Sequence, residues 1–287
     1  MTVERTLFGR ADIARLPALL AVVLLAGCAS GPDPDEAPRP LRFAVIAAPS
    51  VGQEPAEPAP GGEAPSPGGA AAEEPLSSED LLLEAVTQLS GQGELHYVLV
   101  PGPLLARPEP ELHAALGGAL GSLAAAVIVA LAEPDGPREA LIEALDEALR
   151  ERSGEAGQWG PVREGWRALA LTPEGGWPEA AEARAKGKAK ARAADDEAPP
   201  RLLVVHAGPP QPGALARGAL SVTAGAEAAL RREDGRVVLI VPPLIRPPHE
   251  VALVTVAEGR VSVRLRSLAG KERELPPVQL PASTRQD

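Results

Sequence analysis

Aromatic side chains are scarce in this chain of 287 residues, of which phenylalanine, tyrosine and tryptophan together make up 2%. A core with so few of them has to be filled by Val, Leu, Ile and Ala, and the hydrophobic content of 45% is enough for one domain of ordinary size. Cysteine occurs once, at Cys28, so a disulfide within the chain is excluded. Positive charge is outnumbered, since the formal net charge is −11, which argues against nucleic-acid binding.

Proline and glycine are abundant by comparison, with 33 and 29 residues. These numbers exceed what a compact domain of this size uses, so part of the chain is predicted to be disordered. Proline alternates with acidic residues in 28–40, which is typical of a flexible tether, and 53–76 have no apolar period, which predicts a disordered insertion. We therefore expect one domain over 41–268, interrupted by this insertion, and a C-terminal tail over 269–287.

The first 27 residues have the pattern of an export signal. Arg5, Arg10 and Arg15 are followed by an apolar run, 16–26, that is too short to span a bilayer comfortably. The run ends in Leu-Ala-Gly-Cys, which resembles the lipobox of bacterial lipoproteins. This resemblance implies that the Cys28 thiol receives a diacylglycerol, that 1–27 are removed, and that the new amino terminus is acylated into a stable membrane anchor. An ordinary secretory leader with an accidental cysteine is the alternative.

Ala29 and Ser30 follow the cysteine, where an aspartate would be expected in a lipoprotein kept at the inner membrane of a cell with two membranes. The lipoprotein resemblance therefore implies a bacterial cell-envelope location, lipid-anchored in the outer membrane and facing the periplasm. The lipid bilayer is the expected partner through acylated Cys28, together with a protein of the envelope.

The stretch 41–50 is the first apolar run after the leader, and its β-branched, uncharged centre predicts a strand buried on both faces. Strands and helices then alternate, and the last third turns to strands, with tight hairpin turns at Asp234-Gly235 and Glu258-Gly259. This order predicts an α/β (α+β) domain with mixed sheets. Helices are expected at 78–89, 109–123, 138–152 and 178–194, and further strands at 95–101, 125–131, 166–171, 202–205, 219–223, 237–241, 251–256 and 261–265.

The segments after five of these strands resemble, in order, the motifs of the calcineurin-like metallophosphoesterases, a likeness that covers about 41–268. That family has D-x-H, G-D, G-N-H-[DE], a lone His and G-H-x-H at these places. The corresponding segments here are Ala48-Pro49-Ser50, Gly102-Pro103, Ala132-Glu133-Pro134-Asp135, His206-Ala207-Gly208, and Gly225-Ala226-Glu227-Ala228.

The resemblance implies a two-sheet sandwich of mixed strands flanked by helices. The family's chemistry needs carboxylate, imidazole and amide ligands that converge on two cations, so that a bridging hydroxide attacks phosphorus. Most of these ligands are replaced here, while Asp135 and His206 match the family. We therefore expect a non-catalytic binding or scaffolding module with no catalytic residue, no cofactor and no metal. The degenerate metal-site positions are Ala48, Ser50, Pro103, Glu133, Pro134, His206, Ala226 and Ala228.

Two alternatives remain open. Asp135 and His206, with Glu133 or Glu227, could rebuild a site for one divalent metal ion, which would make the protein a metal-dependent phosphoric ester hydrolase. The simpler interpretation is that the acids are solvated loop residues and the histidine a hydrogen-bonded structural one. The second alternative is an unrelated α/β lipoprotein that binds a small molecule.

Overall fold

The computed structural model describes residues 39–53, 76–132, 135, 160–171, 200–208 and 219–281. All of them belong to the second of two compact units, Arg39–Asp287, the first being Met1–Pro38. The predicted signal peptide, most of the tether and of the insertion, and the helices expected at 138–152 and 178–194 lie outside the described residues. Within the described ranges, none of the helices is long and apolar enough to cross a membrane.

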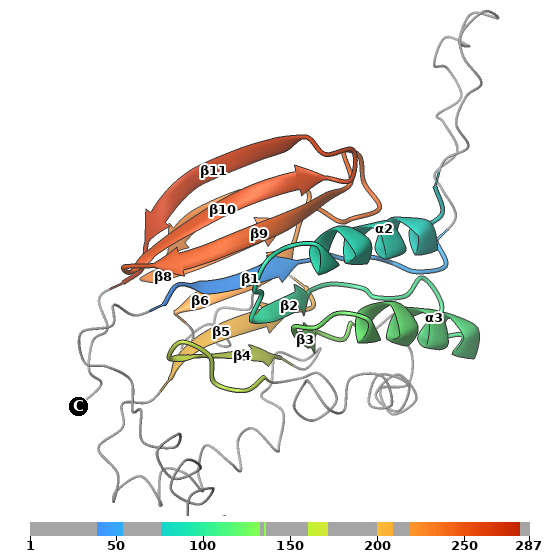
Figure 1. Ribbon diagram of the computed structural model, residues 1–287, viewed down its shortest axis with the longest axis horizontal. Coiled ribbons are helices and arrows are strands. Elements are labelled where there is room, and N and C mark those ends of the chain that lie inside the picture. The colour runs from blue at the N-terminus through green and yellow to red at the C-terminus, as the bar shows by residue number, and fades with distance from the viewer. Residues whose placement is uncertain are drawn as a thin grey trace, which may run out of the picture. The chain divides into compact units, whose positions relative to one another are not determined.

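Two sheets and two helices form the described part of the domain (Figure 1). The six-stranded sheet has the order β11-β10-β9-β1-β2-β3, and the five-stranded sheet the order β4-β5-β6-β8-β7. The elements are β1 (Leu41–Val45), α2 (Ser78–Ser90), β2 (Tyr97–Val100), α3 (Pro110–Gly121), β3 (Ala126–Val129), β4 (Trp166–Ala170), β5 (Arg201–His206), β6 (Leu220–Ala224), β7 (Ala229–Glu233), β8 (Arg236–Val241), β9 (Glu250–Ala257), β10 (Arg260–Ser267) and β11 (Glu272–Gln279).

Both sheets are mixed. In the first, β1, β2 and β3 are parallel, whereas β9 pairs antiparallel with both β1 and β10. In the second, β4, β5, β6 and β8 are parallel and β7 pairs antiparallel with β8. The prediction of an α+β fold with two sheets of mixed strands is confirmed.

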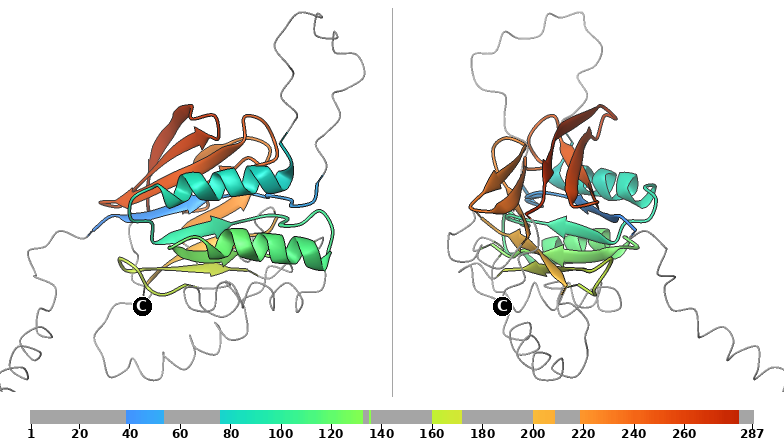
Figure 2. Two further views of the ribbon diagram at one scale, coloured as in Figure 1. Left: turned by 45° about the vertical axis from the view of Figure 1, so that its right-hand side comes forward. Right: turned by 90° about the vertical axis from the view of Figure 1, so that its left-hand side faces the viewer.

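The core has two layers, one on each face of the six-stranded sheet. Phe43 and Val45 of β1 face inward, toward β5 and β6 of the second sheet. Ala44 and Ile46 face the other way and pack under α2 and α3, which lie side by side on the outer face of the sheet (Figure 2). The predicted burial of this strand on both faces is therefore confirmed, and it places the end of β1 between a sheet and a helix layer.

Tyr97 joins the two sheets where β2 passes β4. Its hydroxyl donates to the carbonyl oxygens of Pro161 and Trp166, and its ring packs so closely on Gly160 that a methyl group there would lie 2.7 Å from the ring. Burial raises the pKa of Tyr97 to about 12. Two of the chain's few aromatic side chains, Tyr97 and Trp166, thus fill the seam between the sheets, since both are buried.

The helix and turn signals of the sequence correspond to the structure. Ser77 caps α2 in a capping box with Asp80, and Pro110 stands in the first turn of α3. The two predicted hairpin turns join β7 to β8 and β9 to β10, with positive φ at both central residues of each turn. Helices and strands predicted within the described ranges are confirmed with small shifts of their ends.

The C-terminal tail was predicted too long, because β11 extends the first sheet over Glu272–Gln279. Its sequence is mostly charged and contains two prolines, so it does not look like a strand. It is an edge strand that pairs only with β10, and Pro276 and Pro277 lie where the register of this pairing shifts. A buried carboxylate holds it in place: the guanidinium of Arg273 donates to both oxygens of Glu250, at 2.8 and 2.6 Å. The short edge strand β7 was also missed, because three of its five residues are charged and its sequence has no apolar alternation.

Candidate functional site

The parallel strands place the segments of the predicted motifs at one edge of the sandwich, because the carboxyl ends of parallel strands lie together. The loop after β1 is bonded to the loop after β2 by the amide of Ala48, which donates to the carbonyl of Pro101 at 2.7 Å. It is also bonded to the loop after β8, because the amide of Leu244 donates to the carbonyl of Ala47 at 2.7 Å. We call the loops after β1, β2, β3, β5 and β6 the strand-end cluster.

Gly102 lies at the point where three of these loops meet. Its φ of +90° is one that residues with a side chain rarely adopt, and a Cβ at this position would lie 3.0 Å from the Cβ atoms of both Ala48 and Ala224. Ala48 follows β1, Gly102 follows β2, and Ala224 ends β6 in the second sheet. The structure therefore brings the first and second predicted motif segments into contact with the end of β6, directly before the fifth segment, and small apolar groups fill the contact.

The loop after β1 holds two residues in the left-handed region, Ala48 at φ 39° and Ser50 at φ 45°. For residues with a Cβ this conformation costs on the order of 1 kcal/mol each. The loop is nevertheless fixed, because the amides of Ser50, Val51 and Gly52 donate to Pro103, Leu104 and the hydroxyl of Ser78, respectively.

Ser50 is buried, and its hydroxyl lies 3.5 Å from the carbonyl oxygen of Ala48 in its own loop. No side-chain base bonds to it in the part of the chain that the structure describes. The arrangement is that of a rigid, strained loop and not of an activated nucleophile.

Asp135 links the loops after β2 and β3. Its Oδ1 accepts from the amides of Leu104 at 2.7 Å and Leu105 at 2.9 Å, and its Oδ2 accepts from the amide of Ala132 at 2.7 Å. The side chain is almost fully buried, and burial raises its pKa against the opposing effect of these amides and of the nearby His113. The carboxylate is thus used to satisfy backbone donors, as a buried structural aspartate is.

His206 is the last residue of β5 and is 4% exposed. Burial, and secondarily the charge of Arg236, lowers the pKa of His206 to about 4, so the ring is neutral at pH 7. Its Nε2 is buried and bonds to none of the described residues. The loop after β5 is held to the neighbouring strand β6, because the hydroxyl of Thr223 donates to the carbonyl of Gly208 at 2.8 Å.

The remaining predicted positions contribute little to the cluster. Pro103 is half-buried, Ala226 and Glu227 are exposed and Ala228 is half-buried, while Glu133 and Pro134 lie outside the described residues. Over the ranges that are described, no group of three or more His, Cys, Asp and Glu side chains could hold a metal ion. Asp135, His206 and Glu227 therefore do not form one such group, and the sets that include Glu133 cannot be built from the described residues.

Sequence reasoning missed two features of the cluster. Gly102 was read as the glycine of a motif, but its role is to let the loops after β1 and β6 approach. Leu104 and Leu105 contribute through their backbone amides, which no side-chain motif indicates. The only signal for either was the Gly-Pro pair directly after a buried strand.

No protein-family model matches the chain, and no curated protein matches it. Among solved structures it is similar to TT1561 of Thermus thermophilus, with 13% identity, a TM-score of 0.47, and coverage of 82% of this chain and 98% of that one. An archaeal phosphodiesterase has 9% identity, a TM-score of 0.37, and coverage of 82% and 99%. A predicted phosphoesterase of Streptococcus pneumoniae has 8% identity and a TM-score of 0.37, with coverage of 82% of this chain and 98% of that one. Likenesses at these scores carry no conclusion about what this chain does.

Proposed function

We propose that this protein is an envelope-anchored lipoprotein whose domain has the frame of a metallophosphoesterase but serves as a non-catalytic binding or scaffolding module. The observation that supports this most directly is the contact at Gly102. Ala48 stands at a metal-ligand position of the family, and its methyl group packs against Gly102, as does that of Ala224 at the end of β6, so that no ligand atom lies at this contact.

The order of the five motif segments and their position at strand ends support a metallophosphoesterase ancestry. The loop after β1 supports it further, because Ala48 and Ser50 keep a strained backbone that a plain connection between a strand and a helix would not need. Such strain is typical of loops that display side chains to a ligand, and here it persists although the side chains displayed are small.

The described residues do not fit a two-cation centre. Such a centre requires several carboxylate, imidazole and amide ligands within reach of both ions. Asp135 is occupied by three backbone amides, His206 is the one imidazole among the described residues of the cluster, and Ala48 and Ala224 offer no ligand atoms. We therefore assign no hydrolytic step to the cluster.

The test is an assay of the purified full chain with p-nitrophenyl phosphate and its bis ester, with and without added manganese, together with elemental analysis. We expect no metal-dependent turnover, no stoichiometric metal, and the same result for His206→Ala. His96→Ala is the matched control, because this imidazole bonds to the amide of Arg42, outside the cluster. Stoichiometric metal with turnover that His206→Ala abolishes and His96→Ala keeps would overturn the proposal.

The anchor is tested separately by expressing the chain with Cys28→Ser in a bacterium with two membranes. The wild-type chain is expected to fractionate with the outer membrane and to incorporate labelled palmitate. The variant is expected to lose both properties. A wild-type chain that is soluble and unlabelled would show that the leader is an ordinary export signal.

A single-metal phosphoesterase is the second candidate, and the buried, unbonded Nε2 of His206 is the observation that favours it. An imidazole nitrogen with no partner among the described residues has a lone pair that a metal ion could take. Titration of the full chain with Zn²⁺ separates the candidates: tight binding that is lost in both His206→Gln and Asp135→Asn would support the second one, and weak binding unchanged by either would reject it.

A further inference from the structure

An apolar groove of about 550 Å³ lies beside the first turns of α2. One wall consists of α2 and of Leu76, which precedes it. The second wall is the end of the loop that crosses from β8 to β9, at Pro248 and His249, and the third is the turn between β10 and β11, at Leu268 and Ala269. Its volume is in the range of ligand-binding pockets.

Exposed apolar side chains concentrate in this groove. Leu76 is 55% exposed and Leu83 53% exposed, and both line it. In the part of the chain that the structure describes, the one other large hydrophobic side chain with comparable exposure is Val162, at 42%. Leu83 is not needed for the core, because its neighbours Leu81 and Leu82 already face the sheet. Clustered exposed leucines in a concave surface mark an interaction site.

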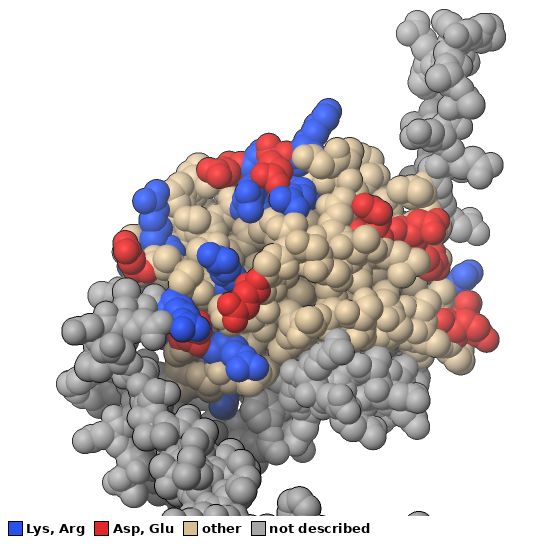
Figure 3. Space-filling view, in the orientation of Figure 1, with Lys and Arg blue, Asp and Glu red and all other residues tan. Residues whose placement is uncertain are grey.

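The groove carries negative charge and no positive side chain. Asp80 and Glu84, one turn apart on α2, both line it, and of the described residues no Lys or Arg does. His249 is the other titratable group in the lining, and its Nδ1 bonds to the carbonyl of Leu244. In Figure 3, acidic side chains gather where α2 begins, while over β10 and β11 Lys and Arg are interleaved with acidic side chains. The groove therefore favours cationic over anionic partners.

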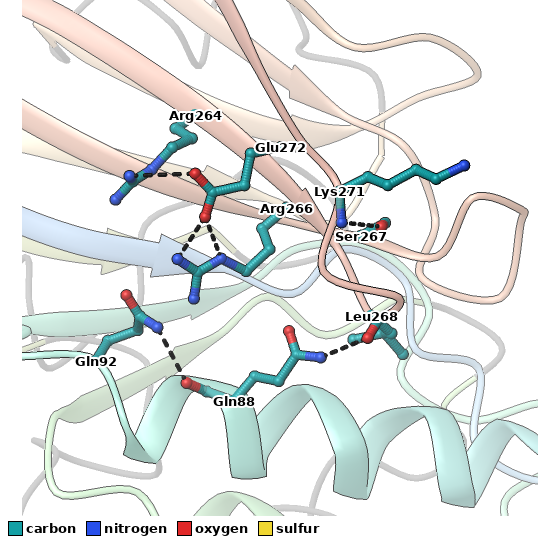
Figure 4. Close-up of polar contacts among 8 residues, drawn as sticks. All are labelled: Gln88, Gln92, Arg264, Arg266, Ser267, Leu268, Lys271 and Glu272. Carbon is teal, nitrogen blue, oxygen red and sulfur yellow. Dashed lines mark hydrogen bonds and ion pairs between the residues drawn. The ribbon is translucent and has the colours of Figure 1, made fainter.

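The walls are fixed to one another in the free protein. The side-chain amide of Gln88 donates to the carbonyl of Leu268 at 2.7 Å, which holds the β10–β11 turn against α2 (Figure 4). The amide of Leu268 in turn donates to the carbonyl of His249 at 2.9 Å. Because the groove is formed before any partner arrives, little conformational entropy is lost on binding.

We propose that this groove binds an amphipathic segment of a partner protein that presents leucine-like side chains to the floor and Lys or Arg to Asp80 and Glu84. An anionic lipid surface fits less well, since the same two carboxylates would repel it. The inference goes beyond the proposed function, because it stands on residues outside the strand-end cluster and holds whether or not that cluster binds a metal.

The experiment uses the full chain and a fluorescein-labelled peptide of leucine and lysine at helical spacing, followed by fluorescence anisotropy. The matched peptide replaces each lysine by glutamate. The test variant is Leu76→Ser with Leu83→Ser, and the control is Val162→Ser, which removes an exposed apolar side chain outside the groove. Circular dichroism verifies that each variant is folded.

We expect the lysine peptide to bind, the double variant to weaken binding by about tenfold, and Val162→Ser to leave it unchanged. Asp80→Asn with Glu84→Gln should weaken binding about threefold and reduce its salt dependence. Equal binding of the lysine and glutamate peptides, or undiminished binding by the double leucine variant, would overturn the proposal. Binding to phosphatidylglycerol vesicles in place of the peptide would overturn it too, in favour of a lipid surface.

Discussion

The strand-end cluster and the groove beside α2 are both built from loops and apolar side chains of one domain, but the cluster excludes solvent and the groove is open to it. In the cluster, Ala48 and Ala224 close on Gly102, and the polar groups of Asp135 bond within the protein. In the groove, Leu76 and Leu83 stay more than half exposed between fixed walls. The difference teaches that loops at the carboxyl ends of parallel strands, where α/β folds usually bind ligands, can be closed by the chain's own side chains. A groove beside a surface helix, in contrast, stays open to solvent.

The largest effect is expected from Gly102→Ala, which tests whether the cluster is closed. The new methyl group would lie 3.0 Å from two Cβ atoms, on a backbone with φ +90°. Strain in the left-handed region and overpacking together should lower the free energy of unfolding by about 2–5 kcal/mol, measured by urea denaturation.

Gly235→Ala is the control, because Gly235 has a similar φ of +77° but no atom within 4 Å of the new methyl group. It carries the strain without the contact, so a loss of about 1–2 kcal/mol is expected. If the two variants lose the same stability, the loops do not meet as described, and the cluster is open.

Acid should weaken the fold through His206. Its pKa falls from 6.5 in the unfolded chain to about 4 in the folded one, mainly because it is buried. Folding therefore favours the neutral ring. Its contribution to the free energy of unfolding is fully present above pH 6.5 and is lost as the pH falls through 4. The loss is about 3 kcal/mol for this group.

The measurement is the free energy of unfolding of the wild type and of His206→Leu between pH 7 and pH 4. Subtracting the two curves removes the contribution of Asp135, whose raised pKa acts in the opposite direction and favours the fold at low pH. The difference in free energy of unfolding between the wild type and His206→Leu should change by about 3 kcal/mol between pH 7 and pH 4. Parallel curves would mean that the imidazole is solvated or charged in the folded protein, and would open the cluster to a ligand.

Backbone strain in the cluster can be measured with two alanines of one loop. Ala47 and Ala48 are both buried, but only Ala48 has a positive φ. Ala47→Gly should cost about 1–2 kcal/mol, because a buried methyl group is lost and the unfolded chain gains entropy. Ala48→Gly should be nearly neutral, since relief of strain offsets the same losses. Equal losses from the two substitutions would show that the loop stores no strain.

Much of the fold could be predicted from the sequence, because its signals are local. The apolar run with β-branched residues predicted β1, and Asp234-Gly235 predicted the hairpin between β7 and β8. The edge strands β7 and β11 were missed, since they need only one partner strand and their sequences are mostly charged. Their pairing depends on the finished sheet and on contacts such as that between Arg273 and Glu250.

The strand-end cluster was less predictable, because its contacts also join residues that are far apart in the sequence. The order of strands indicated which segments would lie near one another, but not that Gly102 would pack closely against both Ala48 and Ala224. The three amides bonded to Asp135 include two that are 30 and 31 residues away in the chain. The sequence carried no signal for the groove, because Leu83 looks like an ordinary position of an amphipathic helix and Leu76 like the end of the predicted insertion until their exposure is known.

The smallest effect on stability is expected at the groove, and this is what separates it from the cluster. Leu83→Ser should change the free energy of unfolding by no more than about 0.5 kcal/mol, because the side chain faces solvent. Leu81, two residues earlier on the same helix, is 4% exposed, and Leu81→Ser should cost about 3 kcal/mol. A large loss from Leu83→Ser would mean that the chain itself covers this leucine, as it covers Ala48. The groove would then be a second closed site, with no surface left for a partner.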